Sequence, residues 1–403
     1  MTAHVSPLTN PSRGADLASR AETAAEAAAK NADDVDRKAR FPSETFAALR
    51  AGRLMSILVP TDLGGEGATV SDVVDVCYAL GRSCGSSGMI FAMHQIMVAI
   101  LRRHARDSAF HRRLMRRLAD EQLLLGSSTT DGTGGGDLRA SACAVAPTGE
   151  QIALTKNAAV VSYGAEADAI LTTARRSPDA PPSDQVLVAV MKDDYRLERT
   201  MAWDAMGMRG TCSAGFMLEA TGACDQVLPV AYQTIHLQSM MPIAHLTWSA
   251  VWTGIAAGAV SRARAFLRNA ARRSGNGSGP QLPPGAAHLT HATASLRSLR
   301  AMISAELARF ERLADNADEI ERLDFQSSMN LLKVNASEMA GKTVMSALQA
   351  CGLSGYRNDG EFSVSRHLRD VLSAPIMINN DRILANAANA SLLVDIPNRL
   401  RDA

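Results

Sequence analysis

This sequence has no excess of charge of one sign, no cluster of cysteines and few aromatic residues. Its 403 residues carry 42 Lys and Arg against 41 Asp and Glu, a net charge of +1. This balance provides no broad positive field to hold a nucleic acid, which argues against nucleic-acid partners. The six cysteines are scattered without a CxxC pair. That pattern argues against a disulfide framework or a metal site and predicts reduced thiols in a cytoplasmic protein.

Long apolar runs are also missing. No uninterrupted stretch of about 18 apolar residues occurs, which is the length that predicts a membrane-spanning helix. The opening stretch MTAHVSPLTNPSRGADLASR has no apolar core of the kind a signal peptide needs. We therefore expect no membrane insertion and no secretion.

The residues that are abundant favour helices. Apolar residues make up 46% and aromatics only 4%, so helix packed on helix is expected rather than an aromatic β-core. Helical periodicity dominates the beginning of the chain and returns around 245–273, 284–315, 324–352 and 375–398. Between them, short apolar segments such as QIALT, AILTTA, QVLVAVM and GFMLEA are separated by Gly, Pro and Ser clusters.

This order predicts a mainly α protein with a β-domain insert. We expect a helical domain over 1–122, a β-rich domain over 123–232 and a helical bundle of four long helices over 233–403. Ligand sites tend to lie in clefts between such domains.

Four motifs in a fixed order carry a resemblance. They are SSTTDGTGGGDLRA (127–140), KNAAVVSYGAEADAILTTA (156–174), WDAMGMRGTCSAGF (203–216) and ALQACGLSGYRNDGEFSVSRHLRD (347–370). Together with the opening FPSETFAALRAGRL they resemble the acyl-CoA dehydrogenase superfamily over nearly nine-tenths of the chain. The resemblance implies that family's fold, in which an N-terminal helical domain, a central β-barrel-like domain and a C-terminal four-helix bundle follow one another.

The resemblance also implies FAD and the residues that bind it. Thr129 and Thr130 would meet the electron-rich edge of the flavin, and Ser162 would place its hydroxyl at flavin N5. The ADP half would be met partly by a neighbouring subunit, which implies a homo-oligomer, a dimer or tetramer. The full set of cofactor-binding residues expected in this way is Thr129, Thr130, Ser162, Arg209, Arg272, Gln349, Gly352 and Asn380.

The sequence departs from the family where a catalytic glutamate is expected. Dehydrogenation of an acyl thioester needs a base for the α-proton, and the two positions where the family keeps it fall at Ile378 and Thr247. Neither side chain can take a proton. Two nearby candidates remain: His245 is either an acid–base group or a histidine satisfied inside the bundle, and Asp381 is either a relocated base or a partner for Arg382.

Two reactions and one non-catalytic role fit these observations. The first is FAD-linked α,β-dehydrogenation of an acyl thioester, on CoA or an acyl carrier protein, with an atypical base and electrons passing to a flavoprotein or O₂. The alternative is a flavin-dependent monooxygenase, which needs no α-proton base and is favoured by the loss of both glutamates. A minor alternative is an oligomeric scaffold that has lost catalysis.

Overall fold

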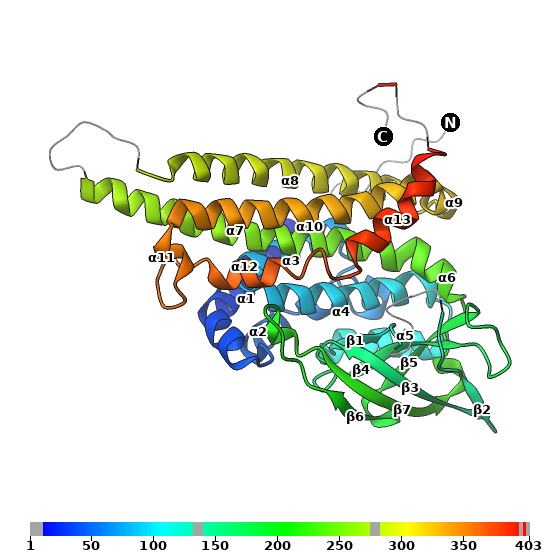
Figure 1. The fold of residues 1–403 in the computed structure, drawn as a ribbon. Coiled ribbons are helices and arrows are strands. Elements are labelled where there is room, and N and C mark those ends of the chain that lie inside the picture. The colour runs from blue at the N-terminus through cyan, green and yellow to red at the C-terminus, as the bar shows by residue number, and fades with distance from the viewer. Residues whose placement is uncertain (1–10, 132–139, 275–282, 395–397, 400–403) are drawn as a thin grey trace.

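The computed structural model describes residues 11–131, 140–274, 283–394 and 398–399. Helices come first along the chain, then two small sheets, then long helices again (Figure 1). The first helices are α1 (Pro11–Lys38), α2 (Ser43–Ala51), α3 (Val70–Ser83), α4 (Gly85–His104) and α5 (Ala109–Glu121).

The β-rich segment forms two sheets. Its strands are β1 (Leu125–Ser128), β2 (Ala146–Thr148), β3 (Gln151–Val161), β4 (Ala169–Arg175), β5 (Gln185–Met191), β6 (Tyr195–Met201) and β7 (Ala214–Ala223). One sheet has the order β1-β4-β5, with β1 parallel to β4, and the other has the antiparallel order β2-β3-β7-β6. The segments expected as strands all lie in these sheets, so the predicted β-domain insert is confirmed.

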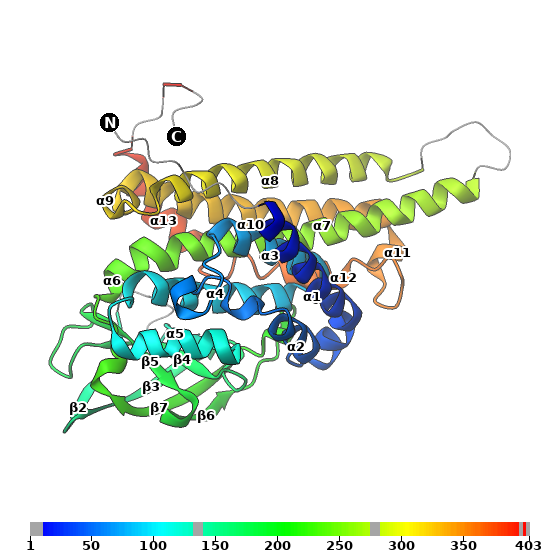
Figure 2. The ribbon, with the colours of Figure 1, turned by 180° about the vertical axis from the view of Figure 1, so that it is seen from behind.

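Long and short helices form the last part of the fold. They are α6 (Tyr232–Ile235), the π-helical turn η6 (His236–Met240), α7 (Met241–Ser274), α8 (Ala286–Leu313), α9 (Ala317–Glu321), α10 (Leu323–Cys351), α11 (Leu353–Tyr356), α12 (Ser365–Val371) and α13 (Asn380–Ser391). α7, α8 and α10 run side by side in both views (Figures 1 and 2). The mainly helical fold class is therefore confirmed.

The fourth long helix, expected over 375–398, is shorter than predicted. α13 begins at Asn380 because Asn379 caps it: the Asn379 side-chain oxygen accepts a hydrogen bond from the Asp381 amide at 2.8 Å. The residues between α12 and α13 form turns, and Ile378 takes a left-handed φ of 46°. This irregular stretch forms part of a cavity wall rather than another turn of the bundle.

α7 is the central helix of the molecule. Among the described residues, the helix Tyr232–Arg273 is long and apolar enough to cross a membrane, but 94% of its most apolar stretch is buried inside the fold. α3 packs so closely on α7 that a Cβ on Gly254 would stand 2.4 Å from the Tyr78 carbonyl oxygen. α4 lies between this bundle and the sheets (Figure 1), and the functional cavity opens beside it.

Candidate active site

A cavity of about 1520 Å³ lies where the sheets, α4 and the long helices meet. Its wall is built from α4, the ends of β1 and β3, the loop before β7, η6 with the start of α7, and α13. Pockets for one small molecule usually span about 300–1,000 Å³. This cavity is therefore large enough for a cofactor and a substrate together.

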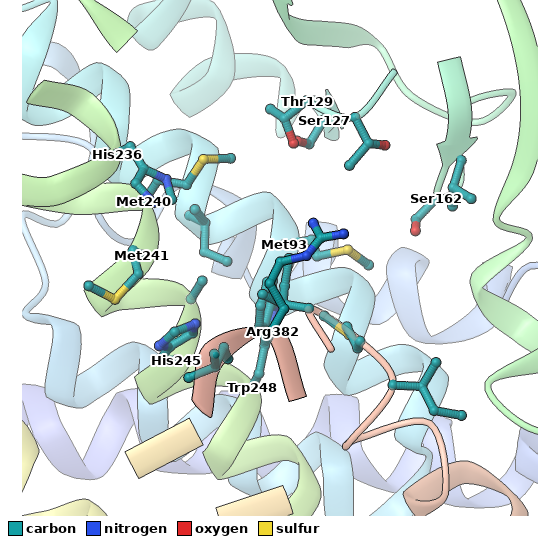
Figure 3. Close-up of a pocket in the computed structure, with 18 of the residues that line it drawn as sticks. Met93, Ser127, Thr129, Ser162, His236, Met240, Met241, His245, Trp248 and Arg382 are labelled. Carbon is teal, nitrogen blue, oxygen red and sulfur yellow. The ribbon is translucent and has the colours of Figure 1, made fainter. Parts of the chain in front are cut away.

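One side of the cavity carries hydroxyl groups. Thr129 and Thr130 directly follow β1, and Ser162 directly follows β3, whose pairing with β7 is irregular between Ala158 and Val161. Such bulges re-aim side chains beside functional sites. Figure 3 shows Thr129 and Ser162 facing the open space. Residues 132–139 of the expected flavin loop, with its four glycines, lie outside the described residues.

The Ser162 hydroxyl belongs to a chain of hydrogen bonds with a fixed direction. Thr211 Oγ1 donates to the Met208 carbonyl oxygen at 2.8 Å, and that carbonyl can only accept. Thr211 must then accept from Ser213 Oγ at 2.7 Å, so Ser213 accepts from Ser162 Oγ at 2.8 Å. Ser162 consequently presents lone pairs, and not its proton, to the cavity.

The residues of this wall fit a flavin. Two threonines and a serine offer polar contacts at one edge of the space, as the resemblance implies for Thr129, Thr130 and Ser162. Val160, at the position where the family usually has Trp, also lines the cavity and is 38% exposed. The side chain that would pack on the face of the flavin ring is thus smaller than the Trp of the family pattern.

Among the described residues that line the cavity, Asp131 is the one carboxylate, and it is held in an ion pair. Lys156 Nζ lies 3.1 Å from Asp131, and the Ala142 amide donates to the same carboxylate at 2.7 Å. Burial lowers the pKa of Lys156, and Asp131 counteracts that shift. Lys156 also donates to the Ser128 and Thr173 carbonyl oxygens. Asp131 is therefore a structural anion and no free base.

Histidine and methionine side chains gather on the other side of the cavity. Figure 3 shows His236, Met240, Met241, His245 and Trp248 there, opposite Thr129 and Ser162. Burial lowers the pKa of His245 to about 3 and that of His236 to about 4. Both imidazoles are neutral near pH 7 because their pKa values lie far below it. His245 lines the cavity as expected, but at this pKa it is a very weak base.

The other residues expected at the reaction centre lie elsewhere. Asp381 is exposed in the first turn of α13, outside the cavity wall. Asn380 is buried, where its Oδ1 accepts from Lys333 Nζ at 2.7 Å and its Nδ2 donates to Ser337 Oγ at 3.0 Å. Thr247 is buried and donates back to the Ile243 carbonyl, whereas Ile378 does line the cavity.

The residues expected to meet the rest of FAD do not line this cavity. Arg209 joins the loop before β7 to α1, since its Nε donates to the Asp36 carbonyl oxygen at 2.8 Å. Arg272, Gln349 and Gly352 are exposed and sit at the ends of α7 and α10. Those helix ends lie far from α13 (Figure 1). A neighbouring subunit would have to bring them to a cofactor, so these assignments stay predictions.

Two features of the site had only a faint signal in the sequence. Lys333 is fully buried, with its Nζ donating to the Ile378 carbonyl oxygen at 2.9 Å, and its one clue is a lysine inside the apolar run MNLLKVNA. The π-helical turn η6 turns His236 and Met240 toward the cavity. Such turns are frequent at functional sites, but residue periodicity does not predict where they occur.

Comparisons with known proteins agree with this architecture. The family described as "Acyl-CoA dehydrogenase, N-terminal domain" matches residues 17–122, and "Acyl-CoA dehydrogenase, C-terminal domain" matches residues 246–378. A probable acyl-CoA dehydrogenase, fadE25 of Mycobacterium leprae, is 24% identical over 91% of each chain. A dibenzothiophene monooxygenase of Mycolicibacterium goodii is 27% identical over 56% of each chain.

The fold also has a close solved counterpart. FMN-bound TdsC, a dibenzothiophene monooxygenase from Paenibacillus sp. A11-2, superposes with a TM-score of 0.82 at 20% identity, covering 95% of this chain and 98% of that one. The two family matches together span more than half of the chain and bracket the strands that carry the hydroxyl wall. The chain belongs to the acyl-CoA dehydrogenase family of flavin-dependent oxidoreductases.

Proposed function

We propose that this chain is a flavin-dependent monooxygenase that acts on a mainly apolar substrate. The observation that carries the proposal is the composition of the cavity wall. Among the described residues, its one carboxylate is tied to Lys156, and its two histidines are neutral with strongly lowered pKa values. A wall of this kind offers no strong base for the α-proton of an acyl thioester.

The hydroxyl chain supports the same proposal. Ser162 offers an acceptor to the cavity because its proton is used on Ser213. Reduced flavin carries a ring N–H at N5, where oxidised flavin has a bare nitrogen. An acceptor at this place therefore favours the reduced form, which is the form that a monooxygenase presents to O₂.

The apolar side of the cavity serves the reaction by excluding water. Met93, Met240 and Met241 line the space with few polar atoms, and a dry site limits side reactions of activated oxygen. Bound reduced flavin would supply two electrons, so that substrate, O₂ and two protons give the oxygenated product and one water. The relative from Mycolicibacterium and the TdsC structure, both named as monooxygenases, add support.

The dehydrogenation of an acyl thioester stays a prediction that the cavity favours less. Its support is the match to fadE25 over 91% of each chain. FAD likewise stays a prediction, because the residues expected at its ADP half lie away from the cavity, and TdsC binds FMN. Titration of the flavin-free protein with FMN and FAD measures which flavin binds more tightly.

The proposed function is tested by isotope labelling. Purified protein receives reduced FMN from a separate flavin reductase, under ¹⁸O₂, with a panel of neutral aromatic compounds that includes 2-naphthol and dibenzothiophene. We expect a product that carries one ¹⁸O atom and forms only with intact protein and reduced flavin. Unlabelled products across the panel, together with anaerobic bleaching of oxidised flavin by acyl-CoA, would establish dehydrogenation instead.

A further inference from the structure

The protonation of His245 is fixed by its neighbour on α10. Its Nδ1 lies 3.0 Å from the carbonyl oxygen of Met329, and a carbonyl can only accept a hydrogen bond. Nδ1 therefore carries the ring proton. Since burial keeps this imidazole neutral, its second nitrogen, Nε2, has a bare lone pair. His245 lines the cavity, so the nitrogen turned away from Met329 is a hydrogen-bond acceptor for a ligand.

Flat and polarisable groups surround this acceptor. The Trp248 ring lies 6.1 Å from the His245 ring at an angle of 47°. Met240 and Met241 lie on the same side of the pocket as His245, and Met93 lies toward its middle beside Arg382 (Figure 3). Thioethers and an indole make favourable contacts with the faces and edges of aromatic rings. We call His245, Trp248, Met93, Met240 and Met241 the histidine–methionine subsite.

Charge around the subsite argues against a cationic ligand. The nearest buried cation is Lys333, which disfavours protonation of His245 but is itself occupied by the Ile378 carbonyl and Asn380 Oδ1. Arg382 also lines the cavity near these side chains and adds positive charge there (Figure 3). A ligand that matches these surroundings is aromatic, carries no positive charge and has one proton for His245 Nε2 to accept.

We propose that the histidine–methionine subsite binds the hydroxyl-bearing ring of a neutral phenol, whose O–H donates to His245 Nε2. This inference rests on the proposed function, since it names the substrate class of that monooxygenase. The hydrogen bond draws the phenolic proton away from oxygen and raises electron density on the ring carbons ortho and para to it. Those carbons are then better targets for an electrophilic oxygen atom. His245 thus selects the substrate and activates its ring without removing the proton.

The inference is tested by binding alone, with three ligands of nearly the same shape. Protein loaded with oxidised flavin is titrated by calorimetry with 2-naphthol, 2-methoxynaphthalene and naphthalene. A net hydrogen bond of about 0.5–1.5 kcal/mol corresponds to roughly twofold to twelvefold tighter binding of 2-naphthol than of the other two. Equal affinities for the three ligands would overturn the proposal.

Two substitutions at one position place the effect on His245. His245→Leu removes the acceptor, so the preference for 2-naphthol should disappear while naphthalene binds within about twofold of wild type. His245→Gln keeps an amide N–H for Met329 and an oxygen for the ligand, and should retain the preference. His111→Leu, at a buried histidine of α5 outside the cavity wall, is the matched control. A preference that survives in folded His245→Leu would contradict the assignment.

The outcomes separate this inference from the proposed function. A His245-dependent preference without any ¹⁸O-labelled product would leave the subsite standing and refute the monooxygenase. Labelled products formed without any preference for 2-naphthol would support the monooxygenase and refute the subsite. If circular dichroism shows that His245→Leu does not fold, the wild-type ligand series and His245→Gln still test whether the subsite accepts a hydrogen bond.

Discussion

Ser213 determines which way the proton of Ser162 points. It lies between Ser162 Oγ at 2.8 Å and Thr211 Oγ1 at 2.7 Å, and Thr211 is anchored on the Met208 carbonyl. In Ser213→Ala, Ser162 can turn its proton into the cavity and donate to the bare ring nitrogen of oxidised flavin. We expect the preference for reduced over oxidised FMN to fall by roughly twofold to twelvefold, the value of one hydrogen bond.

The measurement for this prediction is the ratio of the two dissociation constants, determined anaerobically with reduced FMN and aerobically with oxidised FMN. Ser249→Ala is the control, because Ser249 is a buried serine of α7 outside the cavity wall. If Ser213→Ala leaves the ratio at its wild-type value, the direction assigned to the hydroxyl chain is incorrect.

At the residue scale, the sequence predicts which side chains line the cavity. It predicts less well which hydrogen bonds and burial each of them has. Ser162, Thr129 and Thr130 line the cavity as expected, because a motif fixes their place directly after strands. The lowered pKa of His245 depends on burial by helices far apart in sequence. Asn380 is bound to Lys333 across 47 residues, and no local pattern indicates that pairing.

At the element scale, the crossing of α3 and α7 depends on glycine. A Cβ on Gly254 would stand 2.4 Å from the Tyr78 carbonyl oxygen, and a Cβ on Gly81 would stand 2.5 Å from the Val251 carbonyl oxygen. Gly254→Ala must therefore push two central helices apart. We expect a loss of about 1–3 kcal/mol in the free energy of unfolding, measured by urea titration.

Gly341→Ala on α10 provides the opposite case. A Cβ there meets nothing within 4 Å, so replacing a helical glycine by alanine should stabilise the protein by roughly 0.5–1 kcal/mol. If both substitutions change the unfolding free energy in the same direction, close packing of α3 on α7 is not what constrains Gly254.

Helices and strands could be predicted where the sequence pattern is local, but the start of a helix was wrong where a capping residue sets it. The apolar segments that alternate with Gly, Pro and Ser form β3, β4, β5 and β7, because turn residues punctuate strands directly. The helix expected over 375–398 is shorter because Asn379 caps α13 and the preceding residues turn along the cavity. The fold class could thus be predicted, whereas the bounds of the element nearest the substrate could not.

At the scale of the whole molecule, buried neutral histidines make stability depend on pH. Burial lowers the pKa of four histidines (His94, His104, His111 and His236) to about 4 and that of His245 to about 3, and it places the pKa of His367 well below 6.5. Below pH 6.5 the unfolded chain binds protons that the folded protein does not. Each histidine then costs about 1.4 kcal/mol per pH unit as the pH falls toward its folded pKa.

Asp370 acts in the opposite direction, since burial raises its pKa to about 6. Burial also raises the pKa of Asp75. Two carboxyls cannot offset six histidines, so the urea midpoint should fall steeply from about pH 6.5 to about pH 4. Unfolding curves at half-unit steps of pH test this expectation. A midpoint that stays constant over that interval would show that these histidines titrate normally in the folded protein.

The division into 1–122, 123–232 and 233–403 and the homo-oligomer also belong to this scale and stay predictions. Leu353 and Tyr356 are 73% and 72% exposed beside Gly352, at the end of the bundle where a neighbouring subunit is expected. The mass of the native protein in solution measures the oligomer.

The measurement that tests the central claim most directly is the visible absorbance of the flavin-loaded protein mixed anaerobically with acyl-CoA. The claim is that no described side chain of the cavity wall can take an α-proton, because Asp131 is paired with Lys156, and the pKa values of His236 and His245 are lowered to about 4 and about 3. We predict that short-, medium- and long-chain acyl-CoA all leave the absorbance of oxidised flavin unchanged. Bleaching by any of them would contradict the account and identify a dehydrogenase.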